Sequence, residues 1–171
     1  YYLNTARIAK VRASEGIQHV HAHVRNIAKD GLCSSSQCFR VYIYLNGDEN
    51  GGHHVATFAV SPGTGRKTPL VSNRALRVAS RSLTKAEKKS KFGKWDMYRI
   101  YGSKSYPGKI PNMPNAMFYM SAIALHGSFD KVDGNKHSHG CVRMRPDESY
   151  FVHGLVREAR GSMTFDVLHT R

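Results

Sequence analysis

The sequence predicts a domain that is mainly β with a few helices. "VYIYL" at 41–45 and "HHVATFAVS" at 53–61 are rich in β-branched and aromatic residues, and the turn-forming "NGDENGG" between them predicts a hairpin. "MTFDVLH" at 163–169 predicts another strand. The chain has 171 residues, of which 40% are hydrophobic, and this is enough for one domain with a substantial core.

The first forty residues predict a helical N-terminal extension. Apolar residues recur between residues 4 and 30 at a spacing closer to helical than to alternating, and Gly31 is placed to end the pattern. The phase slips around "SEG" at 14–16, so we expect two short helices or one broken helix. Residues 41–171 form the main domain in this interpretation.

The rest of the chain combines predicted strands with two helices. Further strands are expected near 98–101 and over 117–125. A short basic helix is expected at 84–93, where a threonine and a glutamate have capping-box spacing. The clearest helix spans 146–161, because it opens with a proline and two acidic residues, carries apolar residues on one side and closes at a glycine.

Three histidines alternate with apolar residues in the run "HVHAH". His19, His21 and His23 are either metal ligands or the polar positions of an amphipathic element, and the second interpretation is favoured. The alternation is also typical of a strand, which conflicts with the helical spacing of the residues around it.

The cysteines divide into a close pair and a single residue. Cys33 and Cys38 flank "SSSQ", a segment short enough to turn back and bring the two sulfurs together. Cys141 has no other cysteine near it in the sequence. In an exported protein this pattern predicts one disulfide and one free thiol, and in a cytosolic protein three reduced cysteines. A zinc site is disfavoured, because the pair lacks a second pair of ligands at finger-like spacing.

Positive charge is concentrated between residues 66 and 109. The formal net charge is +14, and in this region only Glu87 and Asp96 oppose the lysines and arginines. Such a face attracts nucleic acid, anionic membranes or anionic cell-wall polymers, and it equally serves solubility. No zinc-finger spacing or RNA-binding motif accompanies it, so we expect no nucleic-acid partner. No apolar run reaches the roughly 18 residues of a membrane span.

The segment "HSHGCVRMRP" at 137–146 has the parts of a site for a cysteine nucleophile. Gly140 permits a tight turn that exposes the sulfur of Cys141 and points main-chain N–H groups toward a reacting carbonyl. Arg143 supplies positive charge that favours the thiolate and can hold a substrate carboxylate.

Two histidines are candidate bases for this cysteine. His139 precedes Cys141 by two residues, so its ring would not easily reach the sulfur. His126 follows the predicted strand at 117–125, on a separate segment that can come back against the cysteine. Local sequence leaves the choice open.

Three segments, in order, resemble the L,D-transpeptidase catalytic domain family, also called YkuD-type. "ALHG" followed by "SHGCVRM" is similar to the family signature, in which His-Gly is followed by Ser-His-Gly-Cys. "VSPGTGRKTP" at 60–69 and "MPNAMFYMSAIALHG" at 113–127 are similar to two more of its segments. The resemblance covers roughly residues 41–168 and implies a β-sandwich-like catalytic fold.

The resemblance assigns the central roles to a few residues. Cys141 corresponds to the nucleophile, and His126 to the group that takes up its proton and later gives a proton to the leaving amine. The Gly127 carbonyl is expected to orient His126, and the main chain of Gly140 and Cys141 to form the oxyanion hole.

Four more residues are expected around the pocket by the same resemblance. Ser138, His139 and Arg143 would shape it, and Tyr119 would lie on the substrate side. Each has a plainer alternative, such as an ion pair for Arg143 and a core position for Tyr119.

The resemblance implies a peptidoglycan L,D-transpeptidase that needs no metal or organic cofactor. The cysteine would attack the carbonyl at the L-centre of the third residue of a tetrapeptide stem, expel the terminal D-amino acid and pass the acyl group from a thioester to an amine. A 3-3 cross-link results. Water in place of the amine gives the alternative, an L,D-carboxypeptidase or a hydrolase of wall cross-links or wall-protein links.

The implied substrate predicts an exported protein, in the periplasm or the cell wall. Export in turn favours the disulfide between Cys33 and Cys38. Anionic wall polymers then become the expected partner of the basic region, alongside the stem peptides. The sequence indicates no oligomeric state.

Overall fold

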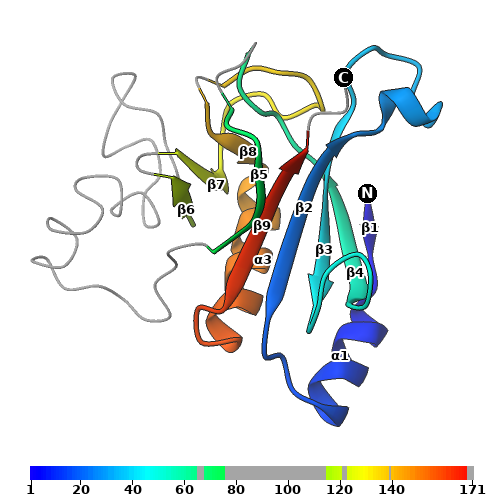
Figure 1. The fold of residues 1–171 in the computed structure, drawn as a ribbon, viewed down its shortest axis with the longest axis vertical. Coiled ribbons are helices and arrows are strands. Elements are labelled where there is room, and N and C mark those ends of the chain that lie inside the picture. Colours follow the sequence, from blue (N-terminus) through cyan, green and yellow to red (C-terminus); the bar gives the residue numbers. More distant parts are fainter. Residues whose placement is uncertain (65–67, 76–114, 121–122, 139, 169–171) are drawn as a thin grey trace, which may run out of the picture.

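The computed structural model describes residues 1–64, 68–75, 115–120, 123–138 and 140–168 (Figure 1). These residues form two sheets, two α-helices and one short 3-10 helix, η1. The elements are, in chain order, β1 Tyr2–Leu3, α1 Thr5–Ser14, β2 Val20–Asn26, η1 Ile27–Asp30, β3 Phe39–Leu45, β4 His53–Ala59, β5 Val71–Ala75, β6 Met117–Met120, β7 Ile123–Gly127, β8 Val142–Met144, α3 Pro146–Glu158 and β9 Met163–Leu168.

The larger sheet has six strands in the order β1-β4-β3-β2-β9-β5. β2 lies inside it, antiparallel to β3 and parallel to β9. The predicted hairpin is confirmed as β3 and β4, and the predicted C-terminal strand as β9. Along β3 the burial alternates, with Phe39, Val41, Ile43 and Leu45 turned into the core, because successive side chains point to opposite faces of the sheet.

The predicted helical extension is correct only for its first part. α1 is a helix, and the Asn4 side chain caps it by accepting a hydrogen bond from the Arg7 N–H at 2.8 Å. The prediction of a helix is wrong for residues 20–26, which form β2. The spacing of Val20 and Val24 fits a helix as well as a strand. The segment forms a strand because it pairs with β3 on one side and β9 on the other. Residues 20–26 therefore belong to the same sheet as the end of the chain.

The single strand predicted at 117–125 is also wrong. It is two antiparallel strands, β6 and β7, which with β8 form the smaller sheet in the order β6-β7-β8. Both strands are mostly buried, so the sequence is apolar except for Ser121, and it contains no glycine, proline or asparagine that would predict the reversal.

The helix predicted at 146–161 is confirmed as α3, which ends at Glu158. Figure 1 shows it behind β9, beside the smaller sheet. Its buried apolar side chains, Val152, Leu155 and Val156, join one core cluster with residues from both sheets. The ring of Phe151 makes an edge contact with that of Phe58 in β4, with the ring centroids 6.0 Å apart. The fold class, mainly β with two helices in mixed sheets, is confirmed.

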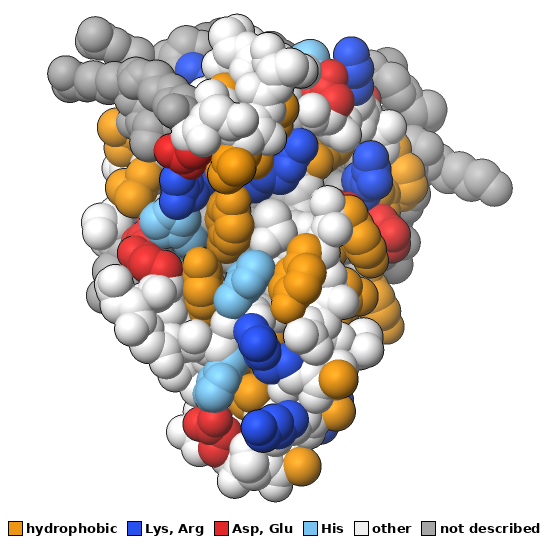
Figure 2. Space-filling view, turned by 90° about the vertical axis from the view of Figure 1, so that its right-hand side faces the viewer, with side chains coloured by type: hydrophobic (Ala, Val, Ile, Leu, Met, Phe, Trp, Pro, Cys, Tyr) orange, Lys and Arg blue, Asp and Glu red, His pale blue; other side chains and the backbone are white. Residues whose placement is uncertain are grey.

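Several expectations lie outside the described residues. They are the strand near 98–101, the helix at 84–93 and, except for Arg74, the basic residues between 66 and 109. On the described surface that faces the viewer in Figure 2, lysine and arginine side chains are interspersed with acidic side chains and histidines. Within the described part of the chain, no helix has the length and apolar character needed to cross a membrane.

Candidate active site

Parallel pairing of β7 with β8 brings His126 next to Arg143. The register aligns Leu125 with Val142 and His126 with Arg143. Leu125 and Val142 are completely buried in the core. Because side chains alternate along a strand, His126 and Arg143 share the opposite side of the smaller sheet.

Cys141 lies one residue before β8, on the same side of the sheet as His126. Its sulfur accepts a hydrogen bond from the backbone N–H of Ala124, which precedes His126 by two residues on β7. Cys141 precedes Arg143 by two residues, and Arg143 is aligned with His126, so the alternation of side chains puts the thiol and the imidazole on the same side of the smaller sheet. Cys141 is the free cysteine of the three, and its side chain is partly exposed.

The His126 ring is buried and held in one tautomer. Its Nδ1 lies 2.5 Å from the carbonyl oxygen of Gly127. A carbonyl only accepts hydrogen bonds, so Nδ1 carries the proton and Nε2 keeps its lone pair. Burial lowers the pKa of His126 to about 4, although the Gly127 carbonyl acts in the opposite direction. The ring is therefore neutral near pH 7 and is able to accept a proton.

The thiol is also held in its neutral form. Burial raises the pKa of Cys141, although the Ala124 N–H and the positive charge of Arg143 act to lower it. Removal from water disfavours the charged form of both groups. The resting pair is therefore a thiol and a neutral imidazole.

The turn before Cys141 is closed by Ser138 and Gly140. Gly140 has a φ of 147°, which glycine adopts more readily than other residues. Its N–H donates to the Ser138 hydroxyl oxygen at 3.1 Å, and this hydroxyl donates to the Cys141 carbonyl. The Gly140 N–H, which was expected in the oxyanion hole, is therefore engaged by Ser138 in this structure.

The segment after β4 carries the chain from the larger sheet to the smaller one. The backbone N–H of Val60 donates to the carbonyl of Phe39 in β3, in the larger sheet. The next residue, Ser61, exchanges two backbone hydrogen bonds, of 2.9 and 3.0 Å, with Arg143 of β8 in the smaller sheet. Farther along, the Thr68 hydroxyl donates to the Gly140 carbonyl at 2.8 Å. This segment therefore fixes both β8 and the turn that presents Cys141.

Gly63 and Thr68 are positioning residues that sequence reasoning did not single out. A Cβ on Gly63 would lie 2.7 Å from the Thr68 hydroxyl oxygen and 2.9 Å from the Gly140 backbone, so only glycine fits. The segment at 60–69 resembled the family, but 72 residues separate Thr68 from Gly140 and nothing local predicts their contact.

Arg143 contacts a carboxylate that is easily displaced. Its guanidinium lies 3.4 Å from the carboxylate of Asp130, whose side chain is 63% exposed. Ion pairs with so exposed a partner contribute about 0–1 kcal/mol. Arg143 can therefore exchange Asp130 for a carboxylate of a substrate at little cost.

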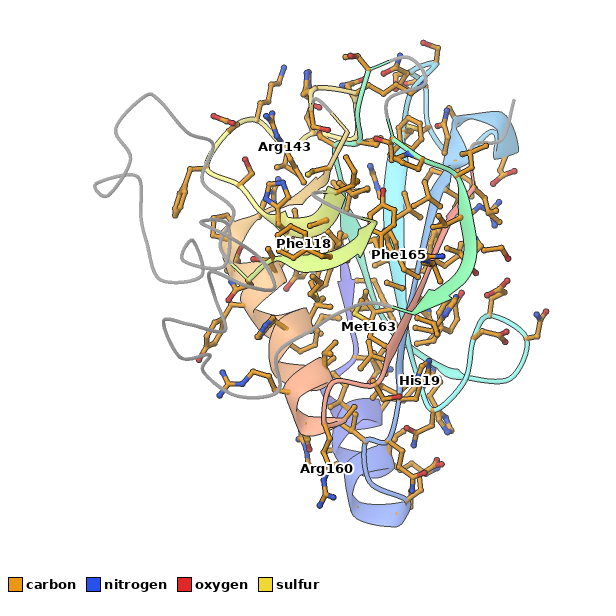
Figure 3. The ribbon with its side chains drawn as sticks, turned by 60° about the vertical axis from the view of Figure 1, so that its left-hand side comes forward. His19, Phe118, Arg143, Arg160, Met163 and Phe165 are labelled. Carbon is orange, nitrogen blue, oxygen red and sulfur yellow. A yellow bond between two sulfur atoms is a disulfide. The ribbon has the colours of Figure 1, made fainter. Side chains whose placement is uncertain are left out.

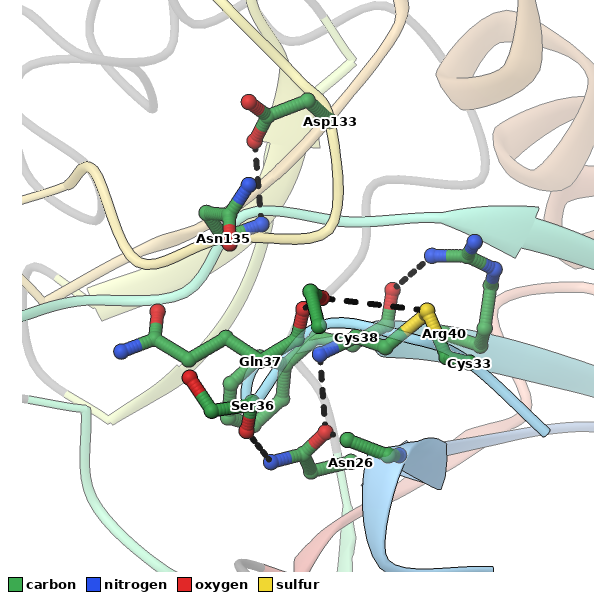
Figure 4. Close-up of a disulfide and its surroundings, with 11 residues drawn as sticks. Asn26, Cys33, Ser36, Gln37, Cys38, Arg40, Asp133 and Asn135 are labelled. Carbon is green, nitrogen blue, oxygen red and sulfur yellow. Dashed lines mark hydrogen bonds between the residues drawn. A yellow bond between two sulfur atoms is a disulfide. The ribbon is translucent and has the colours of Figure 1, made fainter. Parts of the chain in front are cut away.

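The segment that holds the disulfide, drawn in Figure 4, contacts the loop that leads to Cys141. Cys33 and Cys38 are joined by a disulfide, with their Cα atoms 6.3 Å apart. The residues on either side of Cys38 hold the loop: the Gln37 side chain accepts from the Lys136 N–H at 3.0 Å, and the Phe39 N–H donates to the Gly134 carbonyl at 2.8 Å.

Tyr119 occupies the core rather than an open pocket. Its side chain is 2% exposed and packs on the Phe165 ring, with the ring centroids 4.7 Å apart. Figure 3 shows Phe165 on the larger sheet, with Phe118 and Arg143 on the smaller one. Burial raises the pKa of the Tyr119 hydroxyl, and the nearby Cys141 adds to this effect. His139 lies outside the described residues.

Comparison with known proteins identifies relatives of this fold. The family model described as the L,D-transpeptidase catalytic domain, YkuD, matches residues 32–160. A structure of the L,D-transpeptidase LdtMt1 in complex with imipenem has a TM-score of 0.52 at 15% identity, over 87% of this chain and 58% of that one. An L,D-transpeptidase from Mycobacterium smegmatis has a TM-score of 0.51 at 13% identity, over 87% of this chain and 59% of that one.

This chain thus spans less than two thirds of the length of either structure. No curated protein matches it at a significant level.

Replacing Gly63 by alanine tests how the turn is held. We expect Gly63→Ala to lower stability by about 1–3 kcal/mol and to slow modification of Cys141, because the new Cβ displaces the Gly140 backbone. Thermal unfolding and the rate of alkylation by iodoacetamide measure the two effects. The control is Gly51→Ala, whose Cβ meets nothing within 4 Å. Equal behaviour of the two variants would contradict this account of the turn.

The pH dependence of thiol alkylation tests the neutral resting pair. We expect the rate of alkylation of Cys141 to keep rising as the pH increases through about 9, because burial holds the thiol pKa above its usual value. Mass spectrometry of the modified protein gives the rate at each pH. In the unfolded chain the rate should level off above a pKa of about 8.5. If the alkylation rate of the folded protein instead levelled off near pH 6, Cys141 would be a preformed thiolate, and this would disprove the neutral pair.

Proposed function

Because the chain belongs to the family of L,D-transpeptidase catalytic domains, we propose that it is a peptidoglycan transpeptidase with Cys141 as nucleophile and His126 as base. The observation that supports this most is the β7–β8 pair. It sets the Cys141 sulfur against Ala124, on the same side of β7 as a buried, neutral imidazole.

Acylation begins with attack of the thiol on a carbonyl of the stem peptide. As the carbon–sulfur bond forms, the proton of Cys141 passes to Nε2 of His126. The transfer is unfavourable within the resting pair, because burial disfavours both charged forms. Proton transfer is therefore coupled to attack and to stabilisation of the oxyanion by main-chain N–H groups at the Cys141 turn.

Collapse of the tetrahedral intermediate gives the thioester. The bond to the terminal D-amino acid breaks, and His126 returns the proton to the departing amine. The amine of a second stem then attacks the thioester carbonyl, and His126 takes its proton. Release of the sulfur re-forms the thiol and leaves a new amide, which is a 3-3 cross-link when the acceptor is the side-chain amine of a third residue.

Arg143 is the proposed contact for a carboxylate of the stem peptide. Its weak pairing with the exposed Asp130 leaves it able to change partner, and its position opposite His126 keeps it beside the reacting groups. The positive charge also limits how far burial raises the pKa of the Cys141 thiol.

The proposed substrate places the protein outside the cytoplasm. The disulfide between Cys33 and Cys38 supports this location, because such bonds form and persist in oxidising compartments.

Muropeptide analysis tests the proposal. We expect the purified protein, incubated with disaccharide tetrapeptides, to release D-alanine and to form 3-3 cross-linked dimers, because the thioester is resolved by an amine. Cys141→Ala should form neither product. His126→Gln should slow the reaction by at least about a hundredfold, since general base catalysis contributes about 10²–10⁴ in rate.

The products distinguish the reaction classes. Tripeptides without dimers would show that water resolves the thioester, as in an L,D-carboxypeptidase, and would overturn the transpeptidase proposal. Dimer formation by Cys141→Ala would overturn the assignment of the nucleophile.

A further inference from the structure

Four side chains with metal-binding groups gather on the larger sheet, apart from the thiol site. His21 and His23 come from β2, Asp166 comes from β9, and Glu49 comes from the turn between β3 and β4. One ligand atom from each of the four lies within 4.8 Å of the others. Nothing in the proposed transpeptidase chemistry uses these residues.

The parallel pairing of β2 and β9 places the cluster on one face of the sheet. The register aligns His23 with Asp166 and His21 with Thr164. Val24 and Phe165, the neighbours of His23 and Asp166 along each strand, are completely buried and belong to the core cluster. The histidines and the aspartate therefore project from the face of the sheet that is turned away from the core.

The spacing of the ligand atoms suits a tetrahedral ion. Nε2 of His21 and Nδ1 of His23 lie 2.9 and 3.3 Å from the same oxygen of Asp166. They lie 3.5 and 3.7 Å from an oxygen of Glu49. Two ligand atoms that are each about 2.1 Å from a tetrahedral centre are about 3.4 Å apart. The observed distances bracket this value.

Hydrogen bonds behind His21 fix its orientation. Nδ1 of His21 lies 2.7 Å from the Thr164 hydroxyl, which lies 2.8 Å from Nε2 of His19, and Nδ1 of His19 lies 2.7 Å from the Ser162 hydroxyl. Without an ion, Nε2 of His21 donates to the Asp166 carboxylate. With an ion bound, Nε2 would present its lone pair to the metal, and Nδ1 would carry the proton and donate it to the Thr164 hydroxyl. Metal-ligating histidines are commonly oriented in this way.

Charge and burial also favour a cation. His21 and Asp166 have side chains that are 2% and 8% exposed, whereas Glu49 is 37% exposed and leaves the cluster open on its side. Two carboxylates within one small cluster repel each other in a partly desolvated setting. A divalent cation offsets both charges, and Glu49 provides a side from which it can enter.

We propose that His21, His23, Asp166 and Glu49 form a binding site for a divalent transition metal, with zinc the best match. Two imidazoles with two carboxylates suit zinc better than calcium or magnesium, which prefer oxygen ligands alone. The site ties the β3–β4 turn to the β2–β9 pair and has a structural role. Figure 3 shows His19, which directly precedes β2 and contacts the cluster through Thr164, well away from Arg143 of the thiol site.

Zinc titration of metal-free protein tests the proposal. We expect calorimetry to show one equivalent of Zn²⁺ bound with a Kd of about 1 μM or below, and the thermal midpoint to rise with Zn²⁺ by mass action. Co²⁺ should give the intense visible absorption of a tetrahedral site. The same result in Cys141→Ala would show that the thiol is not a ligand.

A pair of matched variants tests whether Glu49 is a ligand of the metal. Glu49→Gln changes an exposed side chain in a turn, so it should fold normally and weaken Zn²⁺ binding at least about tenfold. Glu15→Gln is the control, because Glu15 is 44% exposed and contacts His53, at 2.8 Å, outside the cluster. Thr164→Val should weaken binding by about 10–100-fold by freeing His21.

Two results would overturn the site. One is the absence of Zn²⁺ binding by wild-type protein with a native circular dichroism spectrum. The other is equal binding by Glu49→Gln and Glu15→Gln. Either result would leave the cluster as a network of hydrogen-bonded imidazoles and carboxylates. Both are independent of the thiol chemistry, since the readout is metal affinity.

Discussion

The parallel pairing of β7 with β8 is the constraint on which the thiol site depends. It joins a strand that carries His126 to a strand that begins just after Cys141, and so it brings together two groups from separate segments. The pairing is held from both sides: the buried residues Leu125 and Val142 anchor it in the core, and Ser61 pairs with the outer edge of β8. A shift in this register would separate the thiol from the imidazole.

Burial determines the chemistry that this pairing permits. The same removal from water lowers the pKa of His126 and raises that of Cys141, so neither group is charged near pH 7. A neutral thiol is a poor nucleophile, and it is also less exposed to unwanted oxidation. In the proposed reaction, proton transfer to the imidazole therefore accompanies formation of the oxyanion and does not start from a preformed ion pair.

Sequence patterns predicted the elements that depend mainly on interactions between residues close together in the chain. The β3–β4 hairpin and α3 follow from turn residues, alternation and capping. β2 was missed because the spacing of Val20 and Val24 fits a helix as well as a strand, and only its two partner strands decide. The sequence pointed to Cys141 and His126 through a motif, but the contact of Thr68 with Gly140 and the approach of Asp166 to the histidines join segments far apart in the chain.

The state of the His126 ring tests the central claim most directly. Nitrogen chemical shifts of the labelled imidazole, followed by NMR as the pH is lowered, report both the tautomer and the pKa. The account predicts a proton on Nδ1, a lone pair on Nε2 and a pKa of about 4. A ring that is protonated on both nitrogens at neutral pH, as in a thiolate–imidazolium pair, would contradict it.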